Sequence, residues 1–126
     1  MTPQLTPLPN YETLLSDLKQ FVAVRDWGQF HTAKNLAVSI SIESAELLEH
    51  FQWSDQHSLD REKLSGIQDE AADVLLYLML LSDRLGFDLI EAGSQKLSKN
   101  IKKYPVERCK GSSLKYDKLK DDSQHG

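Results

Sequence analysis

The sequence predicts an all-α protein with the architecture of a four-helix bundle. Two observations carry this prediction. Apolar residues recur at helical spacing in four segments, and no segment shows the alternation of a half-buried strand. The 126 residues suit one compact domain. We expect a flexible arm over residues 1–9, one helical domain over residues 10–119, and a disordered tail over residues 120–126.

The first two helices are predicted from capping residues and helix breakers. Asn10 can cap a first helix, which we expect to end near "RDWGQF", where Gly28 interrupts it. Thr32 can cap a second helix that runs to about Trp53. The polar stretch "SDQHS" that follows is expected to be a loop.

The third and fourth helices have equally local signals. The third is expected from about Leu59 or Glu62 to Leu85, with Gly86 as its C-terminal stop. Asp88 can cap a fourth helix, with Glu91 three residues later as in a capping box. This helix should end at "KKYP", because Pro105 cannot continue it.

Charge and composition limit the kinds of molecule that the protein is expected to bind and the compartment in which it is expected to work. The net charge of -4 argues against a general DNA- or RNA-binding protein. Nine of the fifteen Lys and Arg residues nevertheless lie between Lys96 and Lys120, where they could bind a small anionic ligand or form a solvated tail. The single Cys109 excludes an intrachain disulfide and fits a reducing compartment. Without a signal-like N-terminus or an apolar run long enough for a bilayer, a cytoplasmic protein with no membrane partner is expected.

Four acidic residues interrupt the apolar faces of the second and third predicted helices. Glu43 and Glu46 are three residues apart on one helix, and Glu70 and Asp73 repeat that spacing on the next. Residues so spaced are neighbours, with Cβ atoms about 5–6 Å apart. If the two helices pack through these faces, four carboxylates converge, which is costly without a neutralising cation. Oxygen-only ligands suit Mg²⁺, with Mn²⁺ as a substitute.

The four acids also allow other interpretations. A single Glu-x-x-Glu pair is more often a solvent-facing or salt-bridged surface feature, but here the pair occurs twice, each time on an apolar face. A di-iron carboxylate site needs Glu-x-x-His pairs on two helices, which this chain lacks. One cysteine and scattered histidines support a zinc site poorly.

The acidic pairs and their flanks resemble a known family. "ESAE" (43–46) and "EAAD" (70–73) match the ExxE…ExxD signature of the MazG-like, all-α nucleoside triphosphate pyrophosphohydrolases. The stretches "RDWGQFHTAKNLAVSISIESAELLEHFQW", "DVLLYL" and "KYPVERCKGSSLKY" resemble the dCTP pyrophosphatase branch, and the similarity covers about residues 12 to 119.

The resemblance implies Mg²⁺-dependent hydrolysis of a nucleoside triphosphate, dCTP or a modified pyrimidine deoxynucleotide above all, to the monophosphate and pyrophosphate. Such an activity would serve nucleotide pool sanitation. Water would attack the α-phosphorus, and one carboxylate would activate it. The resemblance also implies a homodimer or homotetramer. The catalytic and metal-binding residues would be Glu43, Glu46, Glu70 and Asp73.

Substrate contacts follow from the same resemblance. Asn100 and Lys103 would contact the phosphates, over which a tail containing Arg108, Lys110, Lys115 and Tyr116 would close. The candidates for base and sugar contacts are Trp27, His31, Trp53 and Tyr77, whose rings can stack on a nucleobase. Leu18 stands where some dCTP-cleaving relatives carry a histidine, which leaves the base preference open.

Two further hypotheses remain. A non-enzymatic helical interaction module would use the apolar faces for a partner and keep the acids as surface charges. A pyrophosphohydrolase of other or broad base specificity would share the four acids. Mg²⁺ should stabilise an enzyme but not an interaction module, because a ligand that binds the native state stabilises it. Measuring hydrolysis of different nucleotides would distinguish a dCTP-specific enzyme from one of other or broad base specificity.

Overall fold

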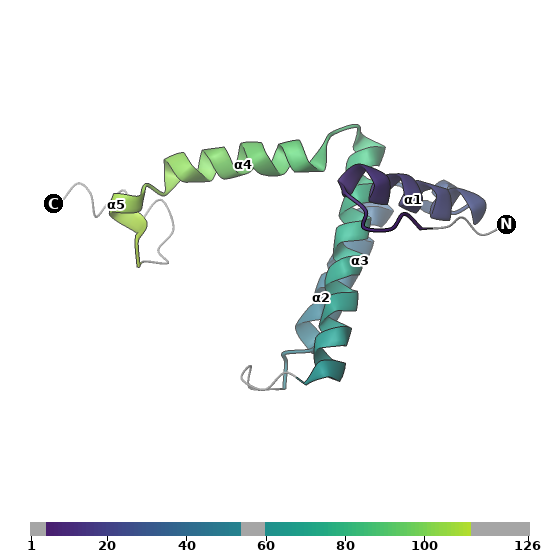
Figure 1. Cartoon of the computed structure of the whole chain (residues 1–126), viewed down its shortest axis with the longest axis horizontal. Coiled ribbons are helices and arrows are strands. Elements are labelled where there is room, and N and C mark those ends of the chain that lie inside the picture. Colours follow the sequence, from purple (N-terminus) through teal and green to yellow (C-terminus); the bar gives the residue numbers. More distant parts are fainter. Residues whose placement is uncertain (1–4, 54–59, 112–126) are drawn as a thin grey trace. The chain divides into compact units, whose positions relative to one another are not determined.

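The computed structural model describes residues 5–53 and 60–111. The chain divides into two compact units, Met1–Phe87 and Asp88–Gly126. Every regular element in the described ranges is a helix, as Figure 1 shows, which confirms the all-α prediction. The single domain expected over residues 10–119 stays a prediction.

The first unit contains α1 (Tyr11–Val24), the short 3₁₀ helix η1 (Gly28–Phe30), α2 (Ala33–Glu49) and α3 (Arg61–Leu85). The predicted cap of α1 is confirmed. The Asn10 side chain accepts a hydrogen bond from the Thr13 backbone N–H, while the Thr13 hydroxyl accepts one from the Asn10 backbone N–H. This reciprocal pair satisfies two N–H groups that the helix geometry leaves without internal partners.

The first helix ends beside "RDWGQF", as predicted, but Gly28 is not the residue that ends it. The helix ends at Val24, and Asp26 takes a left-handed conformation with φ of 54°, whereas Gly28 opens η1 instead of breaking the helix. The Arg25 guanidinium lies 3.8 Å from the centre of the Phe21 ring and donates a hydrogen bond to the Phe21 carbonyl. Trp27 packs edge-to-face on Phe21, with ring centres 5.5 Å apart. These contacts fix the direction of the Trp27 ring.

Helices α2 and α3 lie side by side and form the main helix pair (Figure 1). Thr32 caps α2 by accepting from the Asn35 N–H, as predicted. The expected end near Trp53 is wrong by about one turn, because α2 stops at Glu49 and residues 50–53 form a turn. The predicted "SDQHS" loop lies outside the described residues.

The start and end of α3 are marked by its two caps. Asp60 caps the helix by accepting a hydrogen bond from the Lys63 N–H. The helix therefore begins at Arg61, between the two predicted starts at Leu59 and Glu62. Gly86 ends it with φ of 78°, a conformation that glycine adopts without steric cost. The prediction for the C-terminal stop is therefore confirmed.

The core of the first unit is small and joins its three long helices. Among the described residues its buried apolar side chains are Leu18 and Val22 of α1, Leu36 of α2 and Met79 of α3. Buried Ser82 donates a hydrogen bond to the Met79 carbonyl, and its hydroxyl lies 3.4 Å from the Tyr11 hydroxyl. The core thus fixes α1 against the C-terminal half of α3.

The second unit contains α4 (Leu89–Lys103) and the one-turn helix α5 (Val106–Cys109). Asp88 caps α4 by accepting from the Glu91 N–H, as predicted. Pro105 follows the end of α4 and itself precedes α5, which was not predicted. Among the described helices, none combines the length and apolar character that crossing a membrane requires.

Candidate metal and nucleotide site

Three of the predicted carboxylates converge between α2 and α3. One oxygen from each of Glu43, Glu46 and Glu70 lies within 4.8 Å of the others, and all three residues are half-buried. We call these three residues the acidic cluster. Glu43 and Glu46 lie on successive turns of α2, and the packing of α2 against α3 brings Glu70 close to both. The helix faces expected from the spacing therefore pack together at three of the four predicted acids.

The electrostatics of the acidic cluster centre on Glu43. Its Oε2 atom is buried and has no hydrogen-bond partner among the described residues. Burial raises the pKa of Glu43 from 4.5 to about 7, with further contributions from Glu46, Glu70 and the charge of Asp73. Burying a carboxylate oxygen without a partner is unfavourable. The arrangement therefore favours either a proton or a cation at this position.

Asp73 occupies a different position from the other three acids. It follows Glu70 by about one turn of α3 and is half-buried, but it lies outside the group of three close oxygens. Its carboxylate instead lines an adjacent pocket. The charge of Asp73 still contributes to the raised pKa of Glu43. The prediction that all four acids hold one metal site therefore remains a prediction, with three of them in close contact here.

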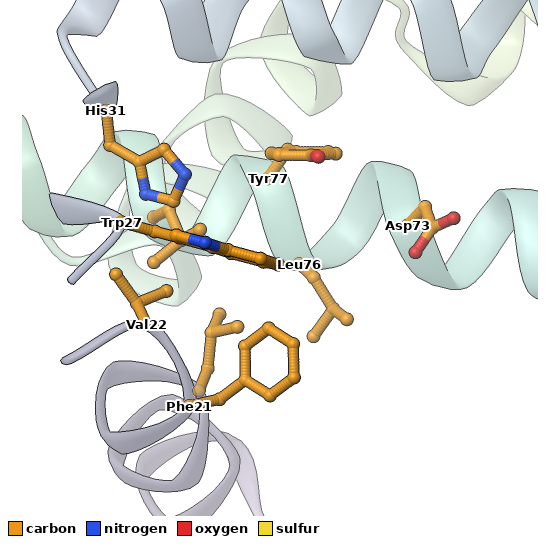
Figure 2. A pocket seen from close by; sticks show the side chains of 9 residues that line it. Phe21, Val22, Trp27, His31, Asp73, Leu76 and Tyr77 are labelled. Atoms are coloured by element: carbon orange, nitrogen blue, oxygen red, sulfur yellow. The ribbon is translucent and has the colours of Figure 1, made fainter. Parts of the chain in front are cut away.

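The pocket beside Asp73 is a cavity of about 230 Å³ formed by α1, α3 and the connection after α1. Figure 2 shows Trp27 and His31 reaching it from that connection, while Tyr77 and Leu76 come from α3. The complete lining is Leu18, Phe21, Val22, Trp27, His31, Asp73, Leu76, Tyr77 and Leu80. We call this cavity the aromatic pocket.

The lining of the aromatic pocket suits a flat heterocycle. The aromatic rings and aliphatic side chains supply apolar contact area, and offset or edge-on ring contacts are favourable for a planar ligand. The His31 imidazole and the Tyr77 hydroxyl supply hydrogen-bonding groups. Three of the four predicted base contacts, Trp27, His31 and Tyr77, are therefore brought together.

The remaining predicted residues belong to other segments of the chain. Trp53 is 88% exposed in the turn after α2 and does not line the aromatic pocket. Asn100 and Lys103 lie on α4, Arg108 lies on α5, and Lys110 follows α5, all in the second unit. Lys115 and Tyr116 lie outside the described residues. The phosphate contacts expected of these residues stay predictions.

Phe21 and His50 are among the residues that contact the site although the sequence analysis did not assign them to it. Phe21 lines the aromatic pocket and also packs against Trp27. The His50 imidazole Nε2 lies 3.8 Å from Oε1 of Glu70. His50 shares the helical stripe of Glu43 and Glu46, one turn beyond Glu46, so its periodicity was the signal that could have identified it.

Comparisons with known proteins show which family the chain is similar to. The sequence model of the MazG-like family matches residues 38–119. Mouse dCTP pyrophosphatase 1 is 35% identical over 121 residues, which cover 92% of this chain and 71% of the mouse protein. Human dCTP pyrophosphatase 1 is 37% identical over 120 residues, with coverages of 90% and 70%.

A solved structure shows the same likeness in three dimensions. The crystal structure of a pyrophosphatase from Archaeoglobus fulgidus DSM 4304 aligns with a TM-score of 0.68 and 44% identity, covering 81% of this chain and 99% of that one. The chain belongs to the MazG-like family. The resemblance drawn from the acidic pairs is thereby confirmed.

Proposed function

We propose that the chain is a divalent-metal-dependent nucleoside triphosphate pyrophosphohydrolase. Its substrate is a deoxynucleoside triphosphate, dCTP or a modified pyrimidine analogue, and its products are the monophosphate and pyrophosphate. The observation that carries the proposal is the acidic cluster, in which one buried Glu43 oxygen has no partner among the described residues, beside an aromatic pocket that shares α3 with it. Relatives named dCTP pyrophosphatase 1 support the choice of base.

The acidic cluster fits a hard divalent cation. Its donors are carboxylate oxygens, which Mg²⁺ and Mn²⁺ prefer, and the buried Oε2 of Glu43 has no other partner in the described residues. Glu43, Glu46 and Glu70 would hold the ion, with Asp73 as a fourth ligand. A bound Mg²⁺ would supply Lewis-acid polarisation and neutralise negative charge on a triphosphate.

The protein's own contribution is positioning. The rise of about 1.5 Å per residue places Tyr77 about 10 Å along the axis of α3 from Glu70. A nucleotide bound with its base in the aromatic pocket would therefore direct its phosphates toward the acidic cluster. Asp73 lies between the two, where a carboxylate can orient or deprotonate a water molecule. In the hydrolysis, water attacks the α-phosphorus, the bond from that phosphorus to the bridging oxygen breaks, and pyrophosphate leaves.

Basic residues of the second unit would complete the charge balance. Lys103 near the end of α4, Arg108 on α5 and Lys110 after it supply positive charge suited to a triphosphate. Asn100 would add a neutral hydrogen-bonding side chain on α4. Lys115 and Tyr116 belong to the same proposal by family resemblance.

We also propose that the chain forms a homodimer or homotetramer and that it works in the cytoplasm. Val38 and Ile42 of α2 and Leu75 of α3 are all more than 40% exposed, and Trp53 is more exposed still. The core of the first unit is small, and burial of these residues against a second copy would stabilise it. Light scattering coupled to size-exclusion chromatography measures this state, and a monomer at micromolar concentration would contradict the proposal.

A helical interaction module remains the second candidate, because the same exposed apolar residues could contact a different protein. It gives no reason for three carboxylates to meet between two packed helices. Mg²⁺ therefore should not raise the unfolding temperature of such a module, whereas it should raise that of the enzyme.

The proposal is tested by measuring hydrolysis of all common dNTPs and NTPs, with Mg²⁺ and with a chelator, while separating pyrophosphate from phosphate. We expect metal-dependent release of pyrophosphate and a monophosphate, with a pyrimidine deoxynucleotide preferred. Release of inorganic phosphate would contradict the reaction. No turnover with Mg²⁺ or Mn²⁺ would favour the interaction module.

A further inference from the structure

A histidine at the end of α2 contacts the acidic cluster from outside. His50 is the C-terminal capping residue of α2, and its Nε2 lies 3.8 Å from Oε1 of Glu70 on α3. Both side chains are mostly buried, at 26% and 23% exposure. The contact therefore joins the end of one helix to a carboxylate on the other, in surroundings where water competes weakly.

Gly66 makes room for this histidine. It lies on α3 one turn before Glu70, and a Cβ atom at this position would lie 2.7 Å from Cε1 of His50. Carbon atoms that are not bonded pack at about 3.5–4.0 Å, so any larger residue would displace the imidazole. Glycine is unfavourable inside a helix. Its presence at residue 66 is accounted for by the imidazole beside it.

We infer that His50 is a positioning residue for Glu70, holding that carboxylate in the orientation that binds the divalent cation. The imidazole nitrogens fall outside the group of close ligand atoms, and Mg²⁺ and Mn²⁺ prefer carboxylate oxygens, so we assign His50 to Glu70 and not to the cation. The contact is longer than a hydrogen bond of about 2.7–3.2 Å. Such contacts are often long in proteins without ligand and shorten on binding. The inference rests on the metal site of the proposed function.

The first test measures cation binding without nucleotide. Isothermal titration of the full chain with MnCl₂ at one fixed pH gives a Kd for wild type, His50→Leu and His50→Gln. Loss of an outer contact to a ligand costs about 10- to 100-fold in metal affinity. We expect about a tenfold rise in Kd for His50→Leu. His50→Gln should stay within about threefold of wild type, because its amide N–H can donate to Glu70.

The second test uses two glycines as a matched pair. Gly66→Ala should weaken Mn²⁺ binding about as much as His50→Leu, because the methyl group displaces the imidazole. Gly93 lies in α4, where an added Cβ would have no atom of the described residues within 4 Å, so Gly93→Ala should bind Mn²⁺ as wild type does. The double variant His50→Leu/Gly66→Ala should bind no more weakly than His50→Leu, since both changes remove one contact.

The outcomes separate the inference from the proposed function. Wild-type protein that binds no Mn²⁺ would remove the metal site and the inference with it. Wild-type binding with an unchanged Kd in His50→Leu would remove the inference alone. A Gln variant as weak as the Leu variant would also overturn it, because the imidazole would then be coordinating the metal. Unfolding temperatures in chelator verify that each variant is folded.

Discussion

The acidic cluster and the aromatic pocket share α3 but differ in whether their buried polar atoms have hydrogen-bond partners. The cluster collects carboxylates, one of which has a buried oxygen without a partner among the described residues. The pocket is lined mainly by apolar and aromatic side chains that need no such partner. The cluster therefore favours a proton or a cation, whereas none of the described pocket side chains has a buried polar atom without a partner. Under the proposed function, metal chemistry and base selection would therefore rest on separate groups of residues.

The largest expected effect comes from Glu46→Gln. Removing one carboxylate from the cluster should reduce turnover about 10³-fold or more for every nucleotide, because several kcal/mol of charge stabilisation are lost. The fold should survive, since the change keeps the side chain's size and reduces repulsion with Glu43. Steady-state pyrophosphate release and circular dichroism check both points.

The matched control for this variant is Glu12→Gln, which changes an exposed acid in the first turn of α1. It should retain wild-type turnover. Activity of Glu46→Gln close to that of this control would remove Glu46 from the metal site.

A smaller and more selective effect is expected from Trp27→Ala. Loss of one stacking surface costs about 1–3 kcal/mol, or roughly 5- to 150-fold in kcat/KM. The effect should fall mainly on KM and should differ among bases, because Trp27 lines the pocket and not the cluster. Trp27→Phe should recover part of the loss. An equal fall in kcat for every nucleotide, with KM unchanged, would contradict the separation of the two regions.

The pH dependence of metal binding follows from Glu43. Its pKa in the folded chain is raised to about 7 from 4.5, so its contribution to metal-free stability is complete below about pH 4.5 and is lost as pH rises through about 7. A cation competes with this proton, so metal affinity should rise with pH, by at most about tenfold per unit for one proton.

Unfolding temperatures from about pH 5 to 8, in chelator and in Mg²⁺, test this expectation. The difference between the two series should widen up to about pH 7 and then level off. In Glu43→Gln the difference should be small and independent of pH. A constant difference in the wild type would mean that Glu43 does not exchange a proton for the metal.

The smallest effect is expected away from both regions. Asn10→Ala removes the side-chain cap of α1 and should lower the free energy of unfolding by about 1 kcal/mol. Asn10→Ser should restore most of it. Because Asn10 contacts neither region, the Mn²⁺ affinity and the ranking of nucleotides should not change. A changed ranking would show that the position of α1 tunes the pocket.

Local signals predicted most of the helices. Capping residues such as Asn10, Thr32 and Asp88 act through hydrogen bonds within three residues, so the sequence alone locates them. The acidic pairs were equally visible, because three-residue spacing on a helix fixes a shared face. The convergence of Glu43 and Glu46 with Glu70 needed only the added assumption that these faces pack together.

Features that depend on distant contacts could not be predicted in this way. The end of α2 at Glu49, and the place of Trp53 outside the aromatic pocket, are not fixed by helical spacing. The pairing of His50 with Gly66 joins two helices across the chain, so neither residue reveals it alone. The left-handed conformation of Asp26 was not predicted either, because it falls on a residue other than glycine, beside the Trp27 ring that packs on Phe21.

The central claim is that Glu43, Glu46 and Glu70 together hold a divalent cation. Anomalous scattering from crystals soaked in MnCl₂ tests it most directly, because the signal locates the metal itself. We predict a peak between the three side chains, at metal–oxygen distances of about 2.0–2.3 Å. The claim would be contradicted if the enzyme needs Mn²⁺ for activity but its soaked crystals show no anomalous peak at these three residues, or show the peak at another place.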